Sequence, residues 1–158
     1  MPGVAGADIE SQLAFFQTCC APLTERMKQG GIHAFACHEN GAVGYGPAEA
    51  DFLFCFITTH RPQKIVQVGC GVSTAVILLA AKEAGYQPQI VCIEPYPTAY
   101  LSRLAEQKFI HLIPKPAQEV DLDVFTNLAA GDLLFIDSSH TVRPGSEVNR
   151  IIDRKSVV

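Results

Sequence analysis

Short apolar runs alternate with amphipathic stretches over the second half of the chain. The runs that predict strands are KIVQVGC from Lys64, QIVCIEP from Gln89, FIHLIP from Phe109 and GDLLFIDSS from Gly131. Between them lie STAVILLAAKEAG, TAYLSRLAEQ and AQEVDLDVFTNLA, which predict helices, the last over most of its length. Strands that alternate with helices form parallel sheets through right-handed crossovers. The pattern therefore predicts an α/β fold.

The predicted strands are almost continuously apolar rather than alternating. This is expected when helices cover both faces of a sheet. We expect a Rossmann-like, doubly wound parallel sheet of about four strands in the order 3-2-1-4.

The first 60 residues show no strand pattern. Residues 9–29 have a helical pattern that ends at Gly30 and Gly31, and residues 38–47, HENGAVGYGP, are rich in turn residues. Pro47 suits the first turn of a further helix that ends before Pro62. We expect a helical lead-in over residues 1–60 and the Rossmann-like domain over residues 61–158.

Composition and charge narrow the class of protein. The chain has 158 residues, 48% of them hydrophobic and 18% charged, which suits one globular domain. Its net charge is −4 and its 12 Lys and Arg are scattered, so we expect neither a nucleic-acid nor a membrane partner. There is no signal-peptide pattern, and the longest apolar run, AVILLAA, is far below the ~18 residues of a membrane span.

The six cysteines favour reduced thiols in the cytoplasm. No Cys-x-x-Cys occurs, and most of the cysteines stand in apolar contexts such as FLFCFI. His33 and Cys37 are one helical turn apart, but no second ligand pair follows, so we expect no metal site. Cys70, at a predicted helix start, is either a reactive thiol or, as we favour, a small side chain between glycines.

Residues with ligand-binding chemistry stand at the carboxyl ends of the predicted strands, where such sheets bind ligands. Gly69 and Gly71 lack the Cβ atoms that would keep a ligand from the backbone. The helix that begins near Ser73 offers free N–H groups to a carboxylate or phosphate. Glu94, 23 residues after Gly71, ends the second strand, where a carboxylate accepts both hydroxyls of a ribose. This combination favours nucleoside binding over a simple packing turn.

The ordered series VQVGCGVST, IVCIEPYP, LIPKPAQEV and DLLFIDSSH resembles the motifs of class I S-adenosylmethionine-dependent methyltransferases, most of all their small-molecule O-methyltransferase-like branch. The resemblance covers roughly residues 50–150. It implies S-adenosylmethionine as cofactor and a small molecule as methyl acceptor. The cofactor-binding residues that it implies are Gln67, Gly69, Gly71, Ser73, Glu94, Ala117, Gln118 and Asp137.

The resemblance also assigns parts of the cofactor to these positions. Gly69 and Gly71 would flank the methionine part and Glu94 would hold the ribose. Ala117 and Gln118 would border the adenine. Asp137 would face the methyl-transfer cleft.

The sequence departs from the family pattern in one residue and in the number of strands. Gln67 stands where the family usually has an acidic residue. The family's sheet has seven strands, whereas this chain reaches the fourth, so we expect a methyltransferase domain truncated at its C-terminus. Its fourth strand would then be an apolar edge that favours self-association.

For catalysis we expect His140 to act as the base that deprotonates a hydroxyl acceptor. Asp137 would orient His140, hold the substrate or, as in metal-dependent relatives, ligate a divalent metal. Such a metal would need further carboxylate or amide ligands from strands beyond the fourth, so we expect no complete metal site in this chain. The alternative for His140 is a structural turn residue bonded to Asp137. Two other functions stay open: a nicotinamide-dependent oxidoreductase, since Glu94 would serve NAD equally well, and a non-catalytic methyltransferase-like fragment.

Overall fold

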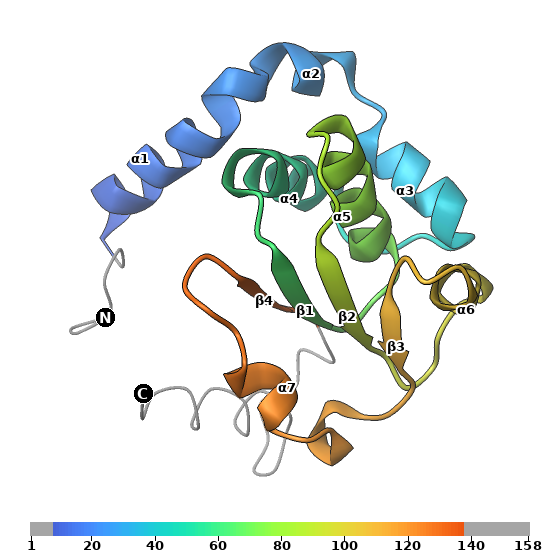
Figure 1. The fold of residues 1–158 in the computed structure, drawn as a ribbon. Coiled ribbons are helices and arrows are strands. Elements are labelled where there is room, and N and C mark those ends of the chain that lie inside the picture. Colours follow the sequence, from blue (N-terminus) through green and yellow to red (C-terminus); the bar gives the residue numbers. More distant parts are fainter. Residues whose placement is uncertain (1–7, 138–158) are drawn as a thin grey trace.

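The computed structural model describes residues 8–137. At its centre is a parallel sheet with the strand order β3-β2-β1-β4 (Figure 1). Its strands are β1 (Lys64–Val68), β2 (Gln89–Ile93), β3 (His111–Ile113) and β4 (Leu133–Ile136). The predicted fold class, strand direction and strand order are confirmed.

The strand register brings three carboxyl ends to one level. Val68, the last residue of β1, lies beside Ile93 of β2 and Ile136 of β4. The backbone N–H of Gly69 continues this pairing by donating to the carbonyl of Ile93 at 3.1 Å. Residues that follow these strands therefore meet at one edge of the sheet.

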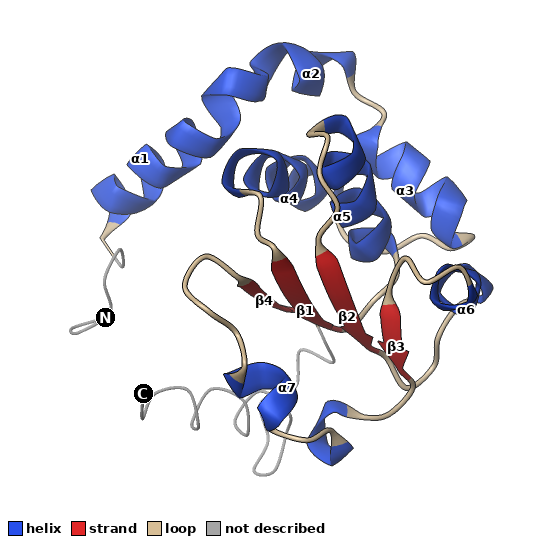
Figure 2. Ribbon diagram, in the orientation of Figure 1, coloured by secondary structure: helices blue, strands red, loops and turns tan. Residues whose placement is uncertain are grey.

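Successive strand residues point to opposite faces of the sheet and enter two separate cores. Ile65 and Cys92 join the larger core, under helices α3 (Ile32–Asn40), α4 (Pro47–His60), α5 (Val72–Glu83) and α6 (Ala99–Glu106). Val66 and Val68 join the smaller core with Phe125 of the short helix α7 (Asp123–Thr126). Figure 2 shows α4 and α5 on one side of the sheet and α7 on the other.

The lead-in is helical as predicted, with one addition. Residues 9–29 form α1 (Ile9–Cys20), a 3₁₀ turn (Ala21–Leu23) and α2 (Thr24–Gln29). Helix α3 was not expected, and the turn begins at Gly41 rather than at residue 38. Ile32 and Ala36 are fully buried, so packing stabilises this helix, and Gly41 ends it in the left-handed conformation at φ 74°.

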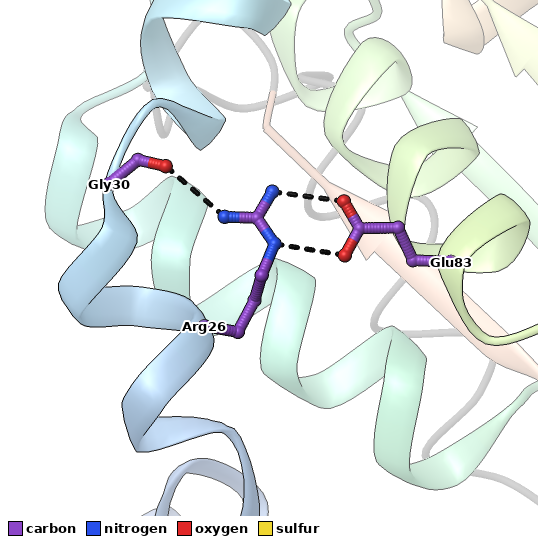
Figure 3. Close-up of polar contacts among 3 residues, drawn as sticks. All are labelled: Arg26, Gly30 and Glu83. Atoms are coloured by element: carbon purple, nitrogen blue, oxygen red, sulfur yellow. Dashed lines mark hydrogen bonds and ion pairs between the residues drawn. The ribbon is translucent and has the colours of Figure 1, made fainter.

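Arg26 fixes the lead-in to the Rossmann-like part. Its Nε and Nη2 donate to the two carboxylate oxygens of Glu83, at the end of α5, both at 2.9 Å (Figure 3). Its Nη1 donates to the carbonyl of Gly30 at 3.1 Å. The Arg26–Glu83 ion pair is partly exposed, so it contributes about 1 kcal/mol or less to the stability of the fold. Its bidentate geometry nevertheless orients the turn before α3.

Helix α1 packs on α4 through aromatic rings and leaves apolar surface exposed. Phe16 stacks on Phe52 with ring centroids 5.6 Å apart, and Phe15 stacks on His60 at 5.4 Å. Ile9 and Leu13 are 74% and 55% exposed. No helix in the stretch from residue 8 to residue 137 has the length and apolar character needed to cross a bilayer.

The helix expected over AQEVDLDVFTNLA is wrong in its extent. The segment forms a 3₁₀ turn (Ala117–Glu119), an extended residue at Val120 and the single turn α7. Val120 and Phe125 are both buried in the smaller core. Five positions apart, they would point about 140° away from each other on one continuous helix, so burying both requires the helix to break.

Candidate functional site

A cavity of about 610 Å³ opens at the carboxyl ends of β1, β2 and β4. One wall is the turn that follows β1, residues 69–71, which we call the glycine turn. The other walls are the segment after β2, the 3₁₀ turn after β3, the first residue after β4 and the loop after α3. Seven of the positions predicted from sequence line it: Gly69, Gly71, Ser73, Glu94, Ala117, Gln118 and Asp137. The eighth, Gln67, lies beneath them.

The glycine turn requires its glycines. Gly69 and Gly71 have φ values of 80° and 151°, where L side chains are strained. A Cβ atom on Gly71 would also lie 3.3 Å from Nδ2 of Asn40, at the end of α3. The turn therefore provides a backbone surface that side chains do not cover.

Gln67 is completely buried and holds this turn from below. Its Nε2 donates to Oγ of Ser73 at 2.5 Å, and its Oε1 accepts from Oγ1 of Thr74 at 2.9 Å. Thr74 Oγ1 in turn accepts from the N–H of Gly71 at 3.1 Å. The amide thus connects β1 to the first turn of α5. A neutral side chain makes both bonds without the cost of burying a charge.

We predict that Gln67→Leu lowers the free energy of unfolding by about 1–3 kcal/mol, because Ser73 and Thr74 lose buried partners. Urea denaturation measures this change. Gln87→Leu, at an exposed position, is the matched control and should stay within about 0.5 kcal/mol of wild type. Equal stability of the Gln67 and Gln87 variants would contradict the role of Gln67.

Glu94 joins the segments that follow β1 and β2. Its Oε2 accepts from the N–H of Cys70 at 3.1 Å and its Oε1 from the N–H of Tyr96 at 3.0 Å. A carboxylate oxygen has two lone-pair positions, so each oxygen retains one for a ligand hydroxyl. Glu94 is therefore positioned by the backbone and still able to bind a diol.

The loop 41–46 of the lead-in forms a wall of the cavity that sequence reasoning missed. Val43, Gly44 and Tyr45 line the cavity. His33 Nε2 and Cys37 Sγ lie 3.3 and 4.0 Å from the carbonyl of Gly44 and thus hold the loop. Within residues 8–137 there is no cluster of three His, Cys, Asp or Glu side chains that could hold a metal ion.

Tyr45 stands between this loop and β4. Its ring meets that of Phe135 edge-on, with centroids 6.0 Å apart, and its backbone has a left-handed φ of 53°. Burial raises the pKa of Tyr45 to about 12, and the carboxylates of Asp137 and Glu49 add to the rise. Its phenol is therefore protonated at neutral pH. The glycine-dense HENGAVGYGP was the signal in the sequence for a loop of this kind.

Of the two residues expected to act in catalysis, Asp137 and His140, the structure describes Asp137. Asp137 lines the cavity, and its N–H donates to the carbonyl of Val68 at 2.8 Å, directly beside the glycine turn. Ser138, Ser139 and His140 lie outside the described residues. The role of His140 therefore stays a prediction.

Cys70 lies at the start of the glycine turn, but its surroundings do not activate it. Its Sγ lies 3.6 and 3.7 Å from the carbonyl oxygens of Gln67 and Ile93. The pKa of the Cys70 thiol is raised well above its usual range. The largest cause is a hydrogen bond with Cys92, and the second is burial of the thiol. These contacts favour a small, protonated side chain over a reactive thiolate.

Comparisons with known proteins agree with this architecture. Residues 66–154, more than half of the chain, match the family model of a methyltransferase domain. An uncharacterized protein of Archaeoglobus fulgidus is 38% identical over 100 residues, which make up 61% of this chain and 45% of that protein. The SAH-bound Podospora anserina methyltransferase PaMTH1 superimposes with a TM-score of 0.55 at 17% identity, over 98% of this chain and 68% of that one. This chain therefore belongs to the methyltransferase domain family and has the fold of the class I S-adenosylmethionine-dependent enzymes.

Proposed function

We propose that the chain binds S-adenosylmethionine and is a small-molecule methyltransferase or the cofactor-binding part of one. The observation that carries this proposal is the cavity at the carboxyl ends of β1, β2 and β4, where the glycine turn and Glu94 meet. The chain spans less than half of its Archaeoglobus relative. We therefore base the proposed methyltransferase activity on the residues of the cavity and not on this relative.

The residues present fit the cofactor. The bare backbone at Gly69 and Gly71 accommodates the methionine part, and Glu94 has acceptor positions for the two ribose hydroxyls. Ala117 and Gln118, on the 3₁₀ turn after β3, border the space assigned to the adenine. When bound, S-adenosylmethionine would supply an activated methyl group for in-line displacement.

The charge of the cavity favours this cofactor over NAD. Among the described residues that line the cavity, Glu94 and Asp137 are carboxylates, and none is Lys, Arg or His. A sulfonium cation is stabilised by such surroundings, whereas the pyrophosphate of NAD would bring two negative charges near two carboxylates. The oxidoreductase alternative therefore has weaker support from the site.

The acceptor and its activation are also part of the proposal. Asp137 and the protonated phenol of Tyr45 border the same end of the cavity, and both can hydrogen-bond a hydroxyl acceptor. We retain His140 as the base, and proximity and alignment supply most of the remaining rate enhancement. A cytoplasmic location is proposed from the six free cysteines, all of them buried or half-buried thiols.

Ligand-induced stabilisation tests the proposal directly. We expect S-adenosylmethionine and S-adenosylhomocysteine to raise the Tm of the chain, with about 2.7 kcal/mol of stabilisation at a ligand concentration of 100 Kd. NAD at the same concentration should leave the Tm unchanged. A shift with NAD alone would support the oxidoreductase alternative, and no shift with any of the three would contradict cofactor binding.

A further inference from the structure

Asn40 links the lead-in to the cofactor cavity. It is the last residue of α3 and lines the cavity. Its amide lies flat against Gly71: Nδ2, Oδ1 and Cγ are 3.3, 3.4 and 3.5 Å from the position that a Cβ of Gly71 would occupy. The side chain is therefore in contact with the turn where the methionine part of the cofactor is proposed to bind.

The hydrogen bonds of Thr98 define the orientation of this amide. Thr98 caps α6, and its Oγ1 accepts from the N–H of Leu101 at 3.4 Å. The hydroxyl hydrogen remains to be donated, and Oδ1 of Asn40 accepts it at 3.0 Å. Nδ2 of Asn40 donates to no residue between 8 and 137. An uncommitted donor group thus lies beside the glycine turn.

A hydrogen-bond donor from Asn40 complements the charged side chains of the cavity, which are all negative among the described residues. The amino-acid part of S-adenosylmethionine carries a carboxylate as well as an ammonium group. The carboxylates of Glu94 and Asp137 suit the cationic groups, but no Lys, Arg or His among the described residues lines the cavity to pair with the carboxylate. Neutral N–H donors take this role in many sites, and a hydrogen bond to a charged acceptor is stronger than one between neutral groups.

We propose that Asn40 recognises the carboxylate of the cofactor's amino-acid part by donating a hydrogen bond from Nδ2. This inference rests on the proposed function, since it assigns a residue to the same cavity. It places a binding determinant in the lead-in, outside residues 66–154 that match the methyltransferase family model. Thr98 acts indirectly, as the positioning residue that keeps Oδ1 turned away from the ligand.

Two ligands that differ in the amino-acid part test the proposal. S-adenosylhomocysteine carries the carboxylate, whereas 5′-methylthioadenosine keeps the nucleoside and lacks the amino-acid group. By isothermal titration calorimetry, Asn40→Ala should weaken S-adenosylhomocysteine about tenfold or more and leave 5′-methylthioadenosine within about twofold. Asn40→Asp keeps the acceptor for Thr98 and nearly the same shape, and it should weaken S-adenosylhomocysteine further because two carboxylates then meet.

Asn127→Ala is the matched control, because Asn127 is exposed and lies outside the cavity lining. It should bind both ligands as wild type does. The role of Asn40 is wrong if both Asn40 variants bind S-adenosylhomocysteine as wild type does, or if they lose affinity equally for both ligands. Either result would leave the proposed function standing. Failure of wild type to bind either ligand would instead overturn the proposed function, and the inference with it.

Discussion

Glu94→Ala is expected to reduce the affinity for S-adenosylhomocysteine by at least about a hundredfold. Two hydrogen bonds from ribose hydroxyls to a carboxylate are lost, each worth about 1.5–3 kcal/mol. The same substitution releases the N–H groups of Cys70 and Tyr96, so the segments after β1 and β2 also lose a shared anchor. Isothermal titration calorimetry of wild type and variant measures the loss.

Two further variants separate the causes of this loss. Glu94→Gln keeps one acceptor oxygen and removes the charge, so it should bind with intermediate affinity. Glu106→Ala, on the exposed surface of α6, removes a carboxylate away from the cavity and should bind as wild type does. If Glu94→Ala and wild type bind S-adenosylhomocysteine equally, the ribose assignment is wrong.

The chain is expected to self-associate through β4. Among the described residues β4 pairs only with β1, and all four of its residues, Leu133 to Ile136, are partly exposed. An apolar edge strand with unpaired N–H and C=O groups is a template for pairing with a second chain. Light scattering should therefore give an apparent mass that rises with protein concentration, and denaturant unfolding should begin at low denaturant.

A lysine on the edge strand should reverse this behaviour, since edge charges oppose strand pairing. We expect Leu134→Lys to shift the chain toward monomer. Leu13→Lys is the matched control, because it replaces a leucine that is 55% exposed on α1, away from the sheet. Recovery of monomer by Leu13→Lys alone would assign the association to α1. A monodisperse wild type with a steep unfolding transition would contradict the prediction altogether.

The part of the site that follows the strands was predictable because parallel strands align their carboxyl ends. Once KIVQVGC, QIVCIEP and GDLLFIDSS were read as neighbouring strands, Gly71, Glu94 and Asp137 had to meet at one edge. The helix boundaries were less predictable. AQEVDLDVFTNLA has helical composition, but burying both Val120 and Phe125 in one core interrupts the helix.

The sequence by itself determined the parallel strands, the glycine turn and the acidic residue at the end of β2, because these depend on neighbouring residues and on the alternation of strands with helices along the chain. The predicted strand order followed from the Rossmann-like class as a whole and not from any local pattern. Only the tertiary structure decided where Asn40, Tyr45 and Gln67 lie relative to the cavity. Asn40 and Tyr45 reach the cavity because α3 and its loop pack on the helices of the Rossmann-like part, a contact between distant segments that no local pattern encodes. Gln67 stands at a position typical of cofactor binding, but its amide is used by Ser73 and Thr74. Such competition for hydrogen bonds is decided only when the buried groups are brought together.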